Sequence, residues 1–107
     1  MIDPETIHRA GRILSETAGE ARVILFGSYA RGDASEESDL DFLIIKPVVK
    51  DRLREMTQLR QVLRPLRVPV DILVCSREEM VERENMSHGV IHWALREGVT
   101  LYDTLLP

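Results

Sequence analysis

The sequence lacks the features of a disulfide-bonded, zinc-binding or membrane-spanning protein. Its single cysteine, Cys75, cannot form an intramolecular disulfide or supply a set of zinc-binding thiolates. This cysteine stands in the apolar run 70–75, which favours a buried packing role over a reactive one. No apolar stretch is long enough to span a membrane, and the acidic first residues do not resemble a signal-peptide core. We therefore expect a cytoplasmic protein with no membrane association.

The chain also lacks an excess of positive charge. Its 18 acidic and 14 basic residues give a net charge of −4, which argues against non-specific binding to a nucleic-acid backbone. The length of 107 residues, with no repeat, linker or low-complexity tract, predicts one small domain over residues 1–107. A domain of this size buries a modest share of its surface, so a homo-oligomer or a partner protein would help to stabilise it.

Hydrophobic periodicity predicts helices and short strands that alternate along the chain. Asp3 and Pro4 are typical of a helix start, and Gly19 is typical of its end. The predicted strands cover residues 22–26, 39–45, 69–74 and 99–102. The predicted helices cover residues 4–18, 51–66 and 87–97, with another that begins at the capping box Ser76-Arg77-Glu78-Glu79. The helix over 51–66 would bury one apolar face, made of Leu53, Met56, Leu59, Val62, Leu63 and Leu66. This order indicates fold class α/β (α+β), built in layers.

Three aspartates occur in segments that are otherwise strongly apolar. Asp39 and Asp41 are two residues apart on a predicted strand, so their carboxylates should point to the same face. Asp71, near the start of another strand, adds a third carboxylate if the two strands are neighbours. Such anions repel one another unless a cation lies between them, and hard oxygen ligands suit Mg²⁺. The three aspartates are therefore candidate metal ligands and catalytic residues.

A turn rich in small residues lies ten residues before the first of these aspartates. Gly27 and Ser28 stand where a strand runs into a short helix, which offers free backbone N–H groups and a favourable dipole to an anion. Ser28 adds a hydroxyl donor, and Arg31 adds a fixed positive charge one turn later. Gly27, Ser28 and Arg31 are therefore candidate triphosphate-binding residues.

Each fragment also has an ordinary structural interpretation. Gly-Ser is common in turns, Asp39 could be a loop residue, and Asp41 could face solvent. Aspartate is disfavoured in strands, however, and here three accompany a phosphate-type turn. The combination favours a functional site.

The run Gly27-Ser28-Tyr29-Ala30-Arg31-Gly32, followed by Ser38-Asp39-Leu40-Asp41, resembles the signature of the DNA polymerase beta-like nucleotidyltransferase superfamily. It is similar to the minimal, stand-alone (MNT) branch of that superfamily. The strand 70–74 resembles the family's third-carboxylate strand, and residues 91–102 resemble the end of such domains. The likeness covers about residues 5–103, nearly the whole chain. Larger members use a C-terminal helical domain for base or acceptor recognition, and we expect none in this chain.

The resemblance implies a polymerase beta-type fold, with a mixed sheet flanked by helices, and a reaction that uses two Mg²⁺ ions and ATP. It implies that Asp39 and Asp41 hold both ions, and that Asp71 helps to hold the catalytic ion and assists deprotonation of the acceptor. It also implies that Ser28 contacts the β- and γ-phosphates and that Arg31 assists the phosphates or the leaving group.

Minimal nucleotidyltransferases of this kind resemble antitoxins that are paired with HEPN-type RNase toxins. The resemblance therefore implies transfer of AMP from ATP to a hydroxyl of a partner toxin. Two alternatives stay open from the sequence: a non-catalytic nucleotide-binding module that neutralises a partner by direct contact, and a small-molecule nucleotidyltransferase of the aminoglycoside-modifying kind.

Other residues carry weaker signals. His88 and His92 have helical i, i+4 spacing, but no third ligand accompanies them, so a structural or surface role is favoured over zinc binding. Trp93 could pack in the core or mark a contact face, and core packing is the favoured prediction. A mixed apolar segment could form a surface for a partner, and it contains Met80, Val81 and Met86.

Overall fold

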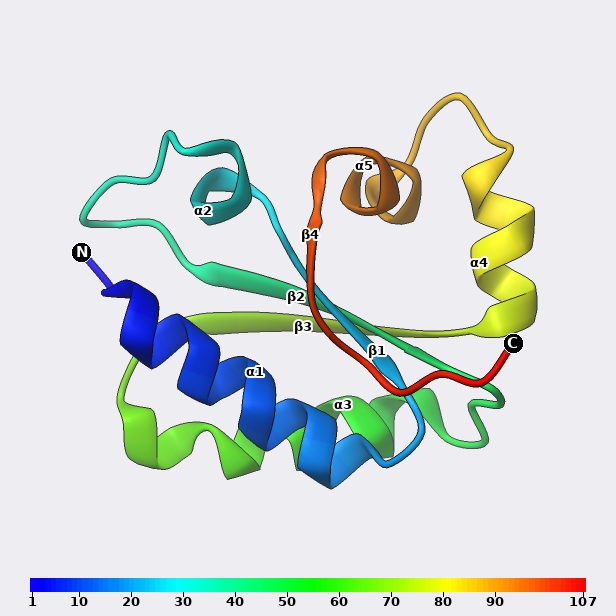
Figure 1. The fold of residues 1–107 in the computed structure, drawn as a ribbon, viewed down its shortest axis with the longest axis horizontal. Coiled ribbons are helices and arrows are strands. Elements are labelled where there is room, and N and C mark those ends of the chain that lie inside the picture. The colour runs from blue at the N-terminus through cyan, green and yellow to red at the C-terminus, as the bar shows by residue number, and fades with distance from the viewer.

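Four strands form one mixed sheet in the order β3-β2-β1-β4 in the computed structural model, which describes residues 1–107 (Figure 1). β1 (Arg22–Phe26) pairs antiparallel with both β2 (Leu40–Lys46) and β4 (Val99–Asp103). β3 (Val70–Ser76) pairs with β2 in parallel. The expected mixed sheet flanked by helices is confirmed.

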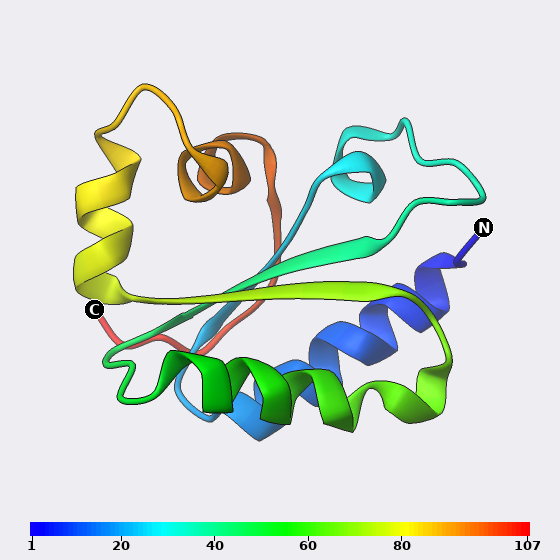
Figure 2. The same ribbon diagram turned by 180° about the vertical axis from the view of Figure 1, so that it is seen from behind.

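Helices cover both faces of this sheet. Those in the chain are α1 (Pro4–Ala18), α2 (Ser28–Arg31), α3 (Arg52–Val62), the 3₁₀ helix η1 (Arg64–Leu66), α4 (Arg77–Glu84) and α5 (Val90–Glu97). α1 and α3 lie on one face, whereas α2, α4 and α5 lie on the other, as the front and back views show (Figures 1 and 2). None of these helices is both long and apolar enough to cross a membrane.

Local capping explains where two of the helices begin. The Asp3 carboxylate accepts a hydrogen bond of 2.7 Å from the amide of Thr6, and Pro4 occupies the first helical position. At α4, the Ser76 hydroxyl accepts from the amide of Glu79, and the Glu79 carboxylate accepts in return from the amide of Ser76. The predicted starts of these two helices are confirmed.

Alternation along the strands divides the core into two layers. Phe42 and Ile44 point toward α1 and α3, where they pack with Leu14 and Leu59 in the larger apolar cluster. Their neighbours on β2, Leu43 and Ile45, point the other way and pack with Ala94 of α5 and with Cys75. The same alternation places odd-numbered β2 positions on the α5 side of the sheet.

Cys75 is fully buried in the second layer, and burial raises the pKa of its thiol to about 11. A thiol with this pKa is protonated at neutral pH and is a poor nucleophile. The predicted packing role of Cys75 is confirmed.

The helix expected over residues 51–66 is shorter. α3 ends at Val62, and the chain tightens into η1, because Pro65 has no N–H and its ring would clash with the preceding turn of an α-helix. Leu53 is 76% exposed, contrary to the prediction that it belongs to the buried face. It stands six residues from the buried Leu59, which places the two side chains about 120° apart around the helix.

Two further boundaries differ from the sequence prediction. The last helix begins at Val90 rather than Ser87, because Gly89 has a φ of 107° and cannot belong to a helix. Asp39 lies one residue before β2 instead of within it, and the pairing begins where the amide of Leu40 donates to the carbonyl of Pro69 at 2.9 Å.

Candidate active site

The turn between β1 and α2 has a backbone shape that only glycine adopts readily. Gly27 has φ 76° and ψ −154°, and its carbonyl accepts hydrogen bonds from the amides of Ala30 and Arg31 at 3.1 and 3.0 Å. No side chain caps the start of α2. The amides of Ser28 and Tyr29 therefore precede the first helical hydrogen bonds and remain available to an anionic ligand.

Gly27 lies directly against the carboxylate of Asp41. A Cβ atom built on Gly27 would stand 2.2 Å from Asp41 Oδ2 and 3.1 Å from its Cγ, so no larger residue fits while the carboxylate stays in place. Phe26, the residue before Gly27, is the antiparallel partner of Asp41 across the sheet. The close approach therefore follows from strand register, and it places the turn and the carboxylate on the same side of the sheet.

The second carboxylate comes from the neighbouring strand. Asp71 of β3 is the direct Cα partner of Asp41 in the parallel pair. Ile72 and Val74, at even-numbered positions of β3, pack in the core layer that contacts α1 and α3. Asp71 is at an odd-numbered position and therefore faces the α5 side of the sheet, as Asp41 does. The condition set from the sequence, that the two strands be neighbours, is met.

Electrostatics link all three aspartates. The pKa of Asp41 is raised above its usual value, first by burial and then by the negative charges of Asp71 and Asp39, while Arg31 opposes the shift. Asp39 and Asp71 themselves are exposed. Although Asp39 lies outside β2, its charge thus still acts on the site.

The donor set fits Mg²⁺ in its chemistry. Three carboxylates that repel one another gain from a divalent cation, and Mg²⁺ binds through one or two carboxylates together with water and phosphate oxygens. No group of three His, Cys, Asp or Glu side chains lies close enough together to hold a metal ion by itself. A metal ion bound at the aspartates would therefore need further ligands, such as water and the phosphate oxygens of a nucleotide.

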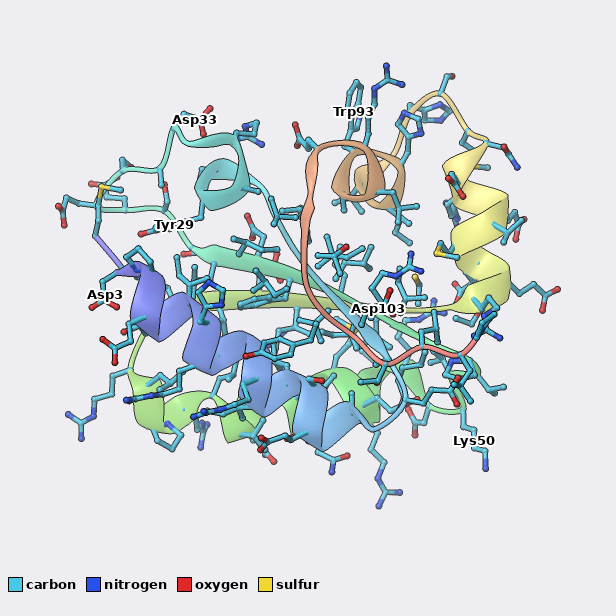
Figure 3. All side chains as sticks on the ribbon, viewed as in Figure 1. Asp3, Tyr29, Asp33, Lys50, Trp93 and Asp103 are labelled. Carbon is cyan, nitrogen blue, oxygen red and sulfur yellow. The ribbon has the colours of Figure 1, made fainter.

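Arg31 is held in place by two carboxylates. Its Nε donates to Asp33 Oδ2 at 3.2 Å, and its Nη1 donates to Glu97 Oε1 at 3.1 Å. Asp33 lies in the loop after α2 (Figure 3), whereas Glu97 is the last residue of α5. The sequence did not single out Glu97 as a site residue, because its partner lies 66 positions earlier in the chain.

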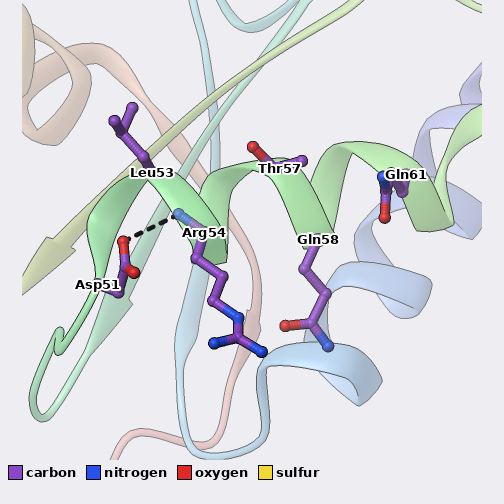
Figure 4. Close-up of a pocket in the computed structure, with 6 residues that line it drawn as sticks. All are labelled: Asp51, Leu53, Arg54, Thr57, Gln58 and Gln61. Carbon is purple, nitrogen blue, oxygen red and sulfur yellow. Dashed lines mark hydrogen bonds between the residues drawn. The ribbon is translucent and has the colours of Figure 1, made fainter.

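The pronounced hollows of the surface lie away from this site. One of them, on the outer side of α3, is lined by Asp51, Leu53, Arg54, Thr57, Gln58 and Gln61 (Figure 4). None of the hollows is lined by Asp39, Asp41 or Asp71. The hollows of the surface therefore do not mark the candidate active site.

The weaker sequence signals gather on and beside α5. Trp93 is 49% exposed and projects outward from α5, so the prediction that it packs in the core is wrong (Figure 3). The next residue, Ala94, faces the sheet, so Trp93 points to the side of α5, roughly 100° around the helix from the buried face. His92 packs edge-on against Trp93, with ring centroids 5.2 Å apart. His88 is exposed and lies before the start of α5, so the two histidines do not share a helix face as their spacing suggested.

Removal of one carboxylate should stabilise the metal-free protein. Asp71→Asn is expected to increase the free energy of unfolding by about 0.2–1 kcal/mol, because it relieves repulsion with Asp41. That corresponds to a rise in Tm of roughly 1–6 °C at neutral pH in the presence of a chelator. A carboxyl with a raised pKa destabilises the fold only while it is ionised, so the gain should vanish as pH falls through that pKa. An unchanged or lower Tm at neutral pH would contradict this electrostatic description.

Residues 7–92 match the protein family described as the nucleotidyltransferase domain. A Methanocaldococcus jannaschii protein with the provisional name protein adenylyltransferase is 36% identical over 86 residues, which are 76% of this chain and 77% of that protein. The protein adenylyltransferase MntA of Thermococcus cleftensis is 31% identical over 88 residues, which are 80% of this chain and 79% of that protein.

Solved structures show the same fold. A structure provisionally described as a minimal nucleotidyltransferase superposes with a TM-score of 0.63 at 31% identity, over 92% of this chain and 95% of that chain. A chain from the complex of tri-AMPylated HEPN toxin with MNT antitoxin of Shewanella oneidensis superposes with a TM-score of 0.60. That match is 16% identical and covers 94% of this chain and 71% of the other, so it supports the fold alone.

Proposed function

Because the chain belongs to the nucleotidyltransferase domain family and is a nucleotidyltransferase, we propose that it transfers AMP from ATP to a hydroxyl group of a partner protein. The observation that carries this proposal is the register of the sheet. It sets Asp41 beside Asp71 on one face and brings the turn at Gly27 against the Asp41 carboxylate. Residues 1–107 would act as one domain.

In this proposal Asp39, Asp41 and Asp71 hold two Mg²⁺ ions together with the triphosphate. When bound, Mg²⁺ would neutralise phosphate charge and lower the pKa of the attacking hydroxyl. Asp71 is exposed at the edge strand β3, where an incoming acceptor can reach it. Asp71 is therefore assigned to the acceptor side, where it would accept the hydroxyl proton.

The turn after β1 would bind the phosphates. The amides of Ser28 and Tyr29 and the Ser28 hydroxyl would donate hydrogen bonds to the β- and γ-phosphates. Arg31 would add a fixed positive charge near the leaving pyrophosphate. The acceptor oxygen would then attack the α-phosphorus in line as the bond to pyrophosphate breaks, and the preorganised donors would stabilise the added charge.

The proposed acceptor is a HEPN-type toxin, which makes this chain its antitoxin. Relatives that share about a third of the sequence carry the name protein adenylyltransferase, and a protein of the same fold stands as MNT antitoxin beside an AMPylated HEPN toxin.

Intact-mass analysis tests this function directly. The purified chain is incubated with MgATP and a HEPN protein encoded beside it, and the toxin is expected to gain one or more AMP units. Parallel reactions with GTP, CTP and UTP measure nucleobase preference, and a reaction with an aminoglycoside tests the small-molecule alternative. If no nucleotidyl mass appears on the toxin with any triphosphate, the catalytic proposal is wrong.

A further inference from the structure

We propose that Glu97 is a positioning residue, which holds Arg31 in the orientation that the triphosphate requires. This inference rests on the proposed function, because it concerns the same nucleotide site. It assigns to α5, at the far end of the chain, a part in building the phosphate-binding turn of α2. Glu97 itself would not touch the substrate.

The geometry of the guanidinium supports this role. Glu97 and Asp33 accept hydrogen bonds from Nη1 and Nε of Arg31, which leaves Nη2 as the nitrogen without an ion pair. Arg31 ends α2, the short helix that begins directly after Gly27, and Gly27 lies against the Asp41 carboxylate. Two of the three guanidinium nitrogens are thus fixed by protein carboxylates, and the guanidinium belongs to the helix that follows the phosphate-binding turn.

The two carboxylates do not contribute equally. The Asp33 side chain is 62% exposed and lies in a loop, whereas the Glu97 side chain is 30% exposed and ends a helix that packs on the sheet. An exposed ion pair to a loop residue fixes little, because solvent screens it and the loop can move. Glu97 is therefore the stronger anchor for Arg31.

The position of Glu97 is itself fixed by close packing of α5 on β1. A Cβ atom on the next residue, Gly98, would stand 2.5 Å from Ile24 Cγ2 and 2.3 Å from the Ala94 carbonyl oxygen, so the backbone here touches the strand. β1 is also the strand that leads into Gly27 and α2. One strand thus supports both ends of the ion pair, and the distance between Glu97 and Arg31 is set by the core.

In the opposite role, Glu97 would hold Arg31 away from the nucleotide, and removal of its charge would lower the Kd for MgATP instead of raising it. Glu97→Gln keeps the size of the side chain and removes its charge. Loss of a negative charge near the site would by itself favour binding of the anionic nucleotide. A positioning role predicts weaker binding in spite of that, so the sign of the change separates the two roles.

The test measures the Kd for MgATP by calorimetry on the full chain. Glu97→Gln is expected to raise the Kd about three- to tenfold, whereas Glu82→Gln, an exposed acid on α4, should change it less than about twofold. Glu97→Asp, which keeps the charge on a shorter side chain, should fall between Glu97→Gln and the parent. In the transfer reaction, KM for ATP should rise by a larger factor than kcat falls.

A double-mutant cycle identifies the route of the effect. In an Arg31→Gln background, the further change Glu97→Gln should no longer raise the Kd, because Glu97 acts through Arg31 and only the favourable loss of a negative charge remains. An equal effect in both backgrounds, or a Kd for Glu97→Gln at or below that of the parent, overturns the inference. A parent chain that binds no MgATP overturns the proposed function as well. If Glu97→Gln does not fold, Glu97→Asp takes its place in the test. A Kd for Glu97→Asp above that of the parent supports the inference, and a Kd at or below it overturns the inference.

Discussion

Replacement of both Asp39 and Asp41 by asparagine is expected to lower the rate of AMP transfer to the partner by roughly a thousandfold or more. Asparagine has almost the same shape, but it carries no charge and is a poor ligand for a hard divalent cation. Asp41 lies between Asp71 and the turn at Gly27, so its replacement removes a proposed metal ligand and the negative charge that lies against the phosphate-binding turn.

The measurement is a time course of intact toxin mass at saturating MgATP, with the folded state checked by thermal unfolding. The double variant should unfold at the same temperature as the parent or higher, since it removes like charges from one another's vicinity. A matched control changes Glu36 and Glu37, two exposed acids of the loop before Asp39, to glutamine and should keep transfer within about twofold of the parent.

The same variant separates catalysis from neutralisation by contact alone. If AMP transfer is the antitoxin activity, cells that carry the toxin should lose protection when Asp39 and Asp41 are replaced. Protection that persists at equal protein abundance would favour the non-catalytic module that the sequence left open. Transfer within tenfold of the parent would contradict the assignment of these two residues.

The substitution Gly27→Ala is expected to destabilise the fold by about 1–3 kcal/mol and to reduce AMP transfer on the order of a hundredfold. Two causes combine. The backbone at Gly27 has a positive φ with an extended ψ, a region that is essentially restricted to glycine. The new methyl group would also collide with the Asp41 carboxylate and push it away from Asp71.

Gly19 provides a matched control for the backbone cost. It has a φ of 78° and ψ of −133°, close to the values at Gly27, but a Cβ atom there would meet nothing within 4 Å. Gly19→Ala should therefore lower Tm through strain while transfer by the folded protein stays near the parent value. Similar activity losses in both variants, at temperatures where both are folded, would show that contact with Asp41 is unimportant.

The two predictions examine different parts of the same arrangement. The aspartate variants remove the chemical groups, whereas Gly27→Ala leaves every group present and displaces one of them. The comparison therefore measures how much of the activity depends on position. In this reaction the phosphorus atom must lie in line between the acceptor oxygen and the leaving group. The rate is therefore expected to be sensitive to displacements of the catalytic side chains by about 1 Å.

The sequence determined the local structure and the identity of the chemical groups. Apolar alternation located the strands, and the capping patterns at Asp3 and Ser76 located two helix starts, because these signals act over a few residues. The spacing from Gly27 to Asp41 identified the family before any geometry was available, and the family match confirms it. Local rules were less reliable where a backbone detail decided the outcome, as at Pro65 and Gly89.

Only the tertiary structure decided which groups meet. Parallel pairing of β2 with β3 brings Asp71 opposite Asp41, and packing of α5 on β1 brings Glu97 to Arg31, across separations of 30 and 66 residues. Trp93 and Leu53 show the same limit, since an apolar side chain is buried only where another element covers it. A sequence specifies contacts between neighbours through the chain itself, whereas distant contacts depend on strand register and core packing, which exist only in the folded whole.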